Sequence, residues 1–184
     1  MMEDKYRNLI ETTNKSEVIF HGRVFDTIVK TVSLADGKEA KREIVVHHGG
    51  ACVLPVDDDL NCYMVRQFRS PFEKILLEVP AGKLEPGEEP LTCAVRELRE
   101  ETGYEADEII PFGGMIASPG YDSEVIWLFM AKGLKQIGQD LDEGEFLNVE
   151  KIPFAELLAM AEEGKIADSK TQLCIYKAAR RLGI

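Results

Sequence analysis

The sequence predicts an α/β fold: helices and a mixed sheet form a sandwich, and a small antiparallel β region precedes it. The chain has 184 residues, enough for one domain of ordinary size with a sizeable core, and 45% of them are hydrophobic. Its first part is rich in β-branched and aromatic residues, whereas the rest alternates short extended and helical segments. We therefore assign residues 1–48 to an N-terminal β-rich region and residues 49–184 to the main domain.

The N-terminal region is predicted to form two long extended segments joined by a turn. Residues 17–34 and 40–48 have the composition of strands, and residues 35–38 (Ala-Asp-Gly-Lys) are typical of a hairpin turn. A small antiparallel sheet is only marginally stable by itself, so this one is expected to pack on another surface. The glycine pair at residues 49–50 marks the boundary of the region.

The main domain begins with a strand of the buried type. Residues 51–56 are continuously apolar, residues 57–61 form an Asp-rich turn, and residues 62–68 are the predicted partner strand. Further strands are predicted over residues 75–79, 109–116, 125–131 and 146–149. The last two segments of the chain are predicted helices, over residues 153–162 and 169–182.

The segment over residues 82–104 differs from its surroundings. A loop rich in Gly and Glu leads to Pro90, which suits the first turn of a helix, and Gly103 provides a C-terminal stop. The helix predicted between them, over residues 91–102, has two stripes. One is apolar and the other acidic, and they consist of Leu91, Ala94, Val95 and Leu98, and of Glu97, Glu100 and Glu101.

The acidic stripe allows two interpretations. It is a solvated helix face, on which Arg96 neutralises Glu100 one turn away, or it is a binding site for a hard divalent cation. A bound cation would offset the mutual repulsion of the carboxylates, and Glu88 in the preceding loop would add an oxygen. The helix alone does not choose between them.

Charge and composition exclude several functions. The formal net charge of −11, without any Lys/Arg-rich stretch, disfavours binding to nucleic acid or to an anionic membrane. No apolar run is long enough to span a bilayer, and residues 1–16 lack the apolar core of a signal peptide, so we expect a cytoplasmic protein. The four cysteines form no CxxC pair and are expected to be reduced core residues.

The fixed residues of the segment over residues 82–104 occur in one order, which is Gly82, Glu88, Arg96, Glu97, Leu98, Glu100, Glu101 and Gly103. This order resembles the signature of the Nudix hydrolases, GX5EX7REUXEEXGU, in which U is a bulky aliphatic residue. Tyr104 stands at the last U, a position that packs rather than reacts. The resemblance implies a Nudix-type α/β/α sandwich with a mixed sheet, and an enzyme that hydrolyses a nucleoside diphosphate linked to another group.

We call residues 82–104 the Nudix box. Motifs outside this box resemble the ADP-ribose pyrophosphatase branch of the family. They lie at residues 42–49, 65–69, 78–82, 118–120 and 142–145. The resemblance implies hydrolysis of ADP-ribose to AMP and ribose 5-phosphate. The alternatives are a hydrolase of another nucleoside diphosphate sugar, such as GDP-mannose, and a non-catalytic nucleotide-binding regulator.

The resemblance also implies the metal site. Two or more Mg²⁺ or Mn²⁺ ions would bind the backbone carbonyl of Ala81 and the carboxylates of Glu97, Glu101 and Glu145. Glu100 would support this cluster, partly through water. Glu143 is the chosen general base for the attacking water, with Glu145 as the alternative.

Substrate contacts and a homodimer are implied in the same way. The predicted substrate-binding residues are Arg42, Glu43, Arg69, Lys83, Ser118 and Glu124. The residue that stacks on adenine is one of Arg23, Val24 and Phe25, and spacing does not choose among them. The N-terminal β region is expected to form the dimer, whose active sites borrow N-terminal residues from the partner.

Overall fold

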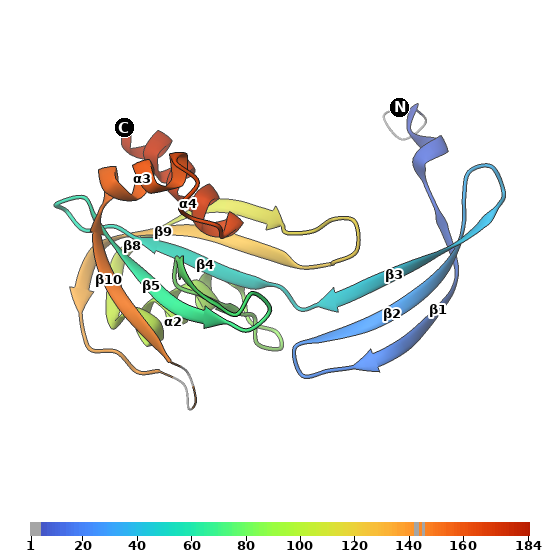
Figure 1. Ribbon diagram of the computed structural model, residues 1–184, viewed down its shortest axis with the longest axis horizontal. Coiled ribbons are helices and arrows are strands. Elements are labelled where there is room, and N and C mark those ends of the chain that lie inside the picture. The colour runs from blue at the N-terminus through green and yellow to red at the C-terminus, as the bar shows by residue number, and fades with distance from the viewer. Residues whose placement is uncertain (1–4, 142–143, 145) are drawn as a thin grey trace. The chain divides into compact units, whose positions relative to one another are not determined.

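The structure is a computed structural model that describes residues 5–141, 144 and 146–184. The chain divides into two compact units. The first comprises Met1–His48 with Ile116–Glu124, and the second comprises Gly49–Met115 with Val125–Ile184. Figure 1 labels most of the elements of each unit.

The first unit contains a three-stranded antiparallel sheet. A short 3₁₀ helix, η1 (Arg7–Leu9), precedes strands β1 (Thr12–His21), β2 (Phe25–Ser33) and β3 (Glu39–His47), which are hydrogen-bonded in that order (Figure 1). The hairpin turn predicted over residues 35–38 is confirmed. Gly37 has a φ of +81°, and the Leu34 N–H donates to the Lys38 carbonyl at 2.8 Å.

The prediction of one extended segment over residues 17–34 is wrong, because the chain reverses at residues 22–24. The carboxylate of Asp26 organises this turn. Its Oδ1 accepts from the Gly22 N–H at 3.3 Å and lies 2.5 Å from the Nδ1 of His21. The two halves of the predicted segment therefore pair with each other as β1 and β2.

The second unit contains two sheets (Figure 1). One has the order β7 (Ala81–Lys83), β4 (Gly50–Pro55), β9 (Val125–Gln136) and β8 (Tyr104–Ile116). In it β4 runs parallel to β9 and antiparallel to β7, so the sheet is mixed. The other sheet is antiparallel, in the order β10 (Leu147–Pro153), β5 (Asn61–Arg69) and β6 (Lys74–Glu78).

The predicted pairing of residues 51–56 with residues 62–68 is wrong. Both edges of β4 are already hydrogen-bonded, to β7 and to β9, and β5 lies in the other sheet. Between β4 and β5 there is an isolated bridge, from Val56 to Cys62. The turn itself is held by Asp57, whose Oδ1 accepts from the Asn61 N–H at 2.8 Å.

The predicted helices are confirmed as α2 (Pro90–Thr102), α3 (Phe154–Glu162) and α4 (Ser169–Leu182). Strand β4 is buried along its whole length, and its alternate side chains point to opposite faces. Ala51 and Val53 pack in a cluster with residues of α2, whereas Cys52 and Leu54 pack in a cluster with residues of α3 and α4. The helices thus cover the two faces of the sheet, which confirms the predicted α/β sandwich.

Two expectations from the composition concern the cysteines and membrane spans. Cys52, Cys62, Cys93 and Cys174 are all buried and free, as expected. Within the part of the chain that the structure describes, no helix has the length and apolar character needed to cross a membrane.

Candidate active site

The acidic helix α2 lies directly against the backbone of β7. A Cβ atom at Gly82 would lie 1.6 Å from Oε1 of Glu97, so a side chain at this position would displace that carboxylate. Glycine is therefore required where the helix crosses the strand. The short strand β7 was predicted as a loop.

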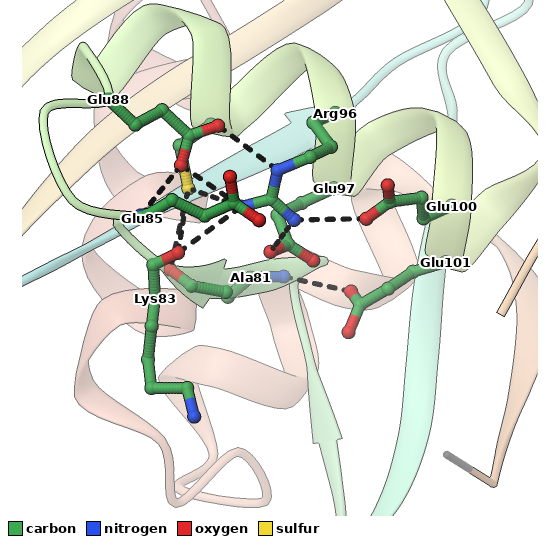
Figure 2. Close-up of polar contacts among 10 residues, drawn as sticks. Ala81, Lys83, Glu85, Glu88, Arg96, Glu97, Glu100 and Glu101 are labelled. Carbon is green, nitrogen blue, oxygen red and sulfur yellow. Dashed lines mark hydrogen bonds and ion pairs between the residues drawn. The ribbon is translucent and has the colours of Figure 1, made fainter. Parts of the chain in front are cut away.

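Two carboxylates of α2 are buried at this crossing. The exposed fraction is 8% for Glu97 and 2% for Glu101. The backbone N–H of Ala81 donates to Oε2 of Glu101 at 2.9 Å, and Figure 2 shows both carboxylates directed toward β7 at Ala81. Buried carboxylates are costly unless they are paired, hydrogen-bonded or bound to metal, which marks this cluster as a functional candidate.

Arg96 joins the other acidic residues of the box. Its Nη1 donates to Oε1 of Glu97 at 2.7 Å and to Oε2 of Glu100 at 3.0 Å, while its Nε donates to Oε1 of Glu88 at 3.0 Å (Figure 2). The hydrogen bond from Arg96 lowers the pKa of Glu88, and Glu88 in turn raises the pKa of Arg96. The contact between Arg96 and Glu100 that the solvated-face interpretation required is present, and the same guanidinium also fixes Glu88 and Glu97.

A further segment fixes the C-terminal end of α2. Gly103 ends the helix with a φ of +73°, and its carbonyl accepts from the N–H groups of Ile137 and Gly138 at 2.8 and 3.1 Å. The amide of Gln139 donates to the Glu101 carbonyl at 2.6 Å, and the Asp140 N–H donates to the Glu100 carbonyl at 3.1 Å. These carbonyls have no partner within a helix, so the segment stabilises the end that carries the glutamates. Sequence reasoning missed Gln139, because its partner is 38 positions away.

The donor atoms at the crossing fit a hard cation. Carboxylate and carbonyl oxygens are the ligands of Mg²⁺ and Mn²⁺, and Ala81, Glu97 and Glu101 supply them. Among the described residues, no three His, Cys, Asp or Glu side chains are arranged to hold a metal by themselves. Here the N–H of Ala81 and the guanidinium of Arg96 bind these carboxylates. The predicted Glu143 and Glu145 lie outside the described residues.

Two of the predicted substrate-binding residues lie in the same unit as this cluster. Lys83 is exposed on β7. Arg69, at the end of β5, forms a bidentate pair with Glu78 of β6, with Nε and Nη2 at 2.7 and 2.8 Å from the two carboxylate oxygens. The exposed fraction of the Arg69 side chain is 36%.

The other four predicted substrate-binding residues belong to the first unit. Arg42 is paired with Glu11, and Glu43 is exposed on β3. The carbonyl of Ser118 accepts from the backbone of the turn that follows it, and Oε1 of Glu124 lies 3.3 Å from the Nδ1 of His47. The candidates for adenine stacking, Arg23, Val24 and Phe25, are exposed at the reversal between β1 and β2.

The fold and the buried glutamates on α2 together define the class of this protein. The model of the NUDIX domain matches residues 46–171, and the chain belongs to the Nudix family. The resemblance in the sequence is thereby confirmed.

The chain is similar to several known proteins. It is 42% identical over 171 residues to an ADP-ribose pyrophosphatase of Bacillus subtilis (strain 168), and this match covers 92% of each chain. It is 43% identical over 167 residues to a methanol dehydrogenase activator of Bacillus methanolicus, with 90% of each chain covered. The crystal structure of an ADP compounds hydrolase has the same fold, with a TM-score of 0.82, 22% identity and 94% of each chain covered.

Proposed function

We propose that this protein hydrolyses the diphosphate of ADP-ribose, giving AMP and ribose 5-phosphate, with the help of a divalent metal. The buried carboxylates of Glu97 and Glu101 beside the backbone of Ala81 are the observation that carries this proposal. The likeness to an ADP-ribose pyrophosphatase supports the choice of substrate. A net charge of −11 also means that an anionic substrate requires local positive charge, from cations and arginines.

The chain's own residues have distinct roles in this reaction. The carbonyl of Ala81 and the carboxylates of Glu97 and Glu101, with Glu145, would hold two or more Mg²⁺ ions, and Glu100 supports the cluster. When bound, such ions neutralise the charge of the diphosphate and lower the pKa of bound water. Glu143 takes the proton of the attacking water, with Glu145 as the alternative base.

Substrate recognition falls to residues outside the metal cluster. Arg69 and Lys83 in the second unit, and Arg42, Glu43, Ser118 and Glu124 in the first, are proposed to contact ADP-ribose. Arginine suits this task because its planar guanidinium binds phosphate through two parallel hydrogen bonds.

Two other functions use the same box, namely hydrolysis of another sugar nucleotide such as GDP-mannose, and nucleotide binding without catalysis. Because the identity to an activator protein is as high as that to a pyrophosphatase, identity alone does not choose. The intact glutamates favour catalysis. Turnover of both sugar nucleotides should be measured with Mg²⁺ and the products identified. We expect a higher kcat/KM for ADP-ribose, whereas tight binding without turnover would establish a regulator.

Arg69→Ala is expected to lower kcat/KM for ADP-ribose by about 1.5–3 kcal/mol, the value of a hydrogen bond to a charged group. The concentration of Mg²⁺ that gives half-maximal activity should barely change. Steady-state kinetics on ADP-ribose and on a small, poorly recognised pyrophosphate measure the effect. The loss should be larger for ADP-ribose, because only that substrate carries the groups that the residues outside the metal cluster are proposed to contact.

Arg66→Ala is the matched control for this experiment. Arg66 lies on the same strand, its side chain has an exposed fraction of 35%, and its Nε is 2.9 Å from Oε1 of Glu150. Its loss removes a partly exposed ion pair without touching Glu78. Equal losses on both substrates for Arg69→Ala, or equal losses for the two variants on ADP-ribose, would reject substrate binding by Arg69.

The protein is also proposed to act as a homodimer through its N-terminal sheet. All ten residues of β1 are exposed, including Val18, Ile19 and Phe20. Among the described residues of the first unit, Val32 is the single hydrophobic residue that is buried. A sheet of three strands that buries so little needs a further apolar surface, and a second copy of the chain would supply it.

Sedimentation at micromolar concentration should find a dimer, and Phe20→Asp should shift it to monomer with a loss of activity. The reason is that a charge replaces an exposed apolar side chain, and that the active site borrows N-terminal residues from the partner. Ser16→Asp, at an exposed polar position of the same strand, is the matched control and should remain dimeric. A fully active wild-type monomer would refute this arrangement.

A further inference from the structure

A buried network of charges lies beside the candidate active site. Its centre is Glu78, at the end of β6, with an exposed fraction of 1%. One side of this carboxylate receives Nε and Nη2 of Arg69, at 2.7 and 2.8 Å. Its Oε2 also receives the Nζ of Lys170 at 2.5 Å. Burial alone would raise the pKa of Glu78, but Arg69 and Lys170 outweigh it and lower the pKa to about 2.

Lys170 stands at an unfavourable position for a cation. It lies in the first turn of α4, where the helix dipole opposes positive charge, and its exposed fraction is 9%. Burial disfavours its charge, yet Asp168 and Glu78 together hold the pKa of Lys170 above its usual range. Its Nζ is 3.0 Å from Oδ1 of Asp168. A buried lysine is retained at such a position only where its partners compensate it.

The network is hydrogen-bonded to the segment that leads from β6 to Ala81. Asp168 caps α4, and its Oδ2 accepts from the Thr171 N–H at 3.0 Å and from the Thr171 hydroxyl at 2.5 Å. Oγ1 of Thr171 in turn accepts from the Val79 N–H at 2.9 Å. Val79 lies two residues before Ala81. The first turn of α4 therefore fixes the segment that carries the proposed carbonyl ligand.

The charges of the network balance. Arg69 and Lys170 contribute two positive charges, and Glu78 and Asp168, which both contact the Nζ of Lys170, contribute two negative charges. Of Arg69, Lys170 and Glu78, Arg69 is the accessible one, because 36% of its side-chain surface is exposed, whereas Lys170 and Glu78 are buried. Within the described part of the chain, the ion pair found for Arg69 is the one with Glu78. The positive charge of Arg69 is thus the charge of this network that a ligand in solvent can reach.

We propose that Lys170 is a positioning residue for the anionic substrate, and that it acts through Glu78. By binding one oxygen of this buried carboxylate, Lys170 shares the negative charge of Glu78, so that Glu78 neutralises Arg69 less and the guanidinium keeps positive charge for the diphosphate. Without Lys170, Glu78 would be paired with Arg69 alone, and the charges of Arg69, Glu78 and Asp168 would sum to −1. The inference deepens the proposed function and rests on it.

Lys170→Met is expected to weaken ADP-ribose binding about tenfold, since one charge-assisted contact is impaired without being removed. The dissociation constant is measured by calorimetry in EDTA, where metal-dependent turnover does not occur, and KM and kcat are then measured with Mg²⁺. We expect KM to rise by a similar factor while kcat changes by less than about twofold. Lys170→Arg should restore most of the affinity, because it restores the charge.

Two further variants distinguish this role from a loss of packing. Lys177→Met changes a half-buried lysine on the same helix and should leave affinity unchanged. In the background of Glu78→Gln, Lys170→Met should have little further effect on affinity, because the charge that Lys170 compensates is already absent. A wild-type dissociation constant in Lys170→Met, or the same tenfold loss in the Glu78→Gln background, would overturn the inference while leaving the proposed function intact. A wild-type protein that neither binds nor hydrolyses ADP-ribose would overturn both.

Discussion

Glu97→Gln and Glu101→Gln are each expected to lower the turnover of ADP-ribose by a factor on the order of 10²–10³. Each substitution keeps the shape of the side chain and removes one charge from the cluster that would hold the cations. The fold should persist, because the amide oxygen of a glutamine at residue 101 can still accept from the Ala81 N–H, now at 2.9 Å from Oε2 of Glu101. Steady-state turnover against Mg²⁺ concentration, with thermal unfolding alongside, measures both effects.

Glu108→Gln serves as the matched control. Glu108 is an exposed acid on β8 and lies outside the box, so the same change of charge there should leave turnover near that of the wild type. Near-normal turnover of either Glu97→Gln or Glu101→Gln with Mg²⁺ present would remove the metal cluster from the reaction.

Gly82→Ala is expected to lower turnover by a factor on the order of 10², because a Cβ at this position would lie 1.6 Å from Oε1 of Glu97. The carboxylate must move, and with it a proposed metal ligand. The backbone of Gly82 has no positive φ, so conformational strain does not explain the loss. Overpacking should cost about 1–3 kcal/mol of stability. Kinetics and thermal unfolding of the purified variant test this.

Gly87→Ala separates the two effects, since Gly87 lies in the turn between β7 and α2 with a φ of +80° and nothing within 4 Å of an added Cβ. Backbone strain should destabilise this variant by about 1–2 kcal/mol, while its turnover stays near that of the wild type. If Gly82→Ala kept full turnover, or if Gly87→Ala lost as much, the close approach of α2 to β7 would not matter for catalysis.

Local patterns in the sequence predicted the helices well. Helix α2 begins at Pro90 and is ended by Gly103, as expected. The spacing of Glu97, Glu100 and Glu101 placed these residues on one face of the helix. Such signals are carried by neighbouring residues, so they can be recognised without tertiary contacts. The glutamates of the box were therefore identified before their surroundings were known.

Non-local contacts were predicted less well. The three residues of β7 are strand only because β4 pairs with them, and the partner of β5 proved to be β10 and β6 rather than β4. Likewise, no periodicity in the sequence connects Glu78 to Lys170, which is 92 positions away. Arg69 was selected as a substrate ligand by resemblance, and its pairing with Glu78 became visible only in the folded chain.

Metal-dependent release of AMP from ADP-ribose decides whether the cluster at Ala81, Glu97 and Glu101 is a catalytic centre. The wild-type protein is incubated with ADP-ribose and Mg²⁺, and AMP and ribose 5-phosphate are quantified over time. We expect the two products in equal amounts, no release in EDTA, and full recovery when excess Mg²⁺ is added back. Intact ADP-ribose in the presence of Mg²⁺, or equal release with and without EDTA, would contradict this function.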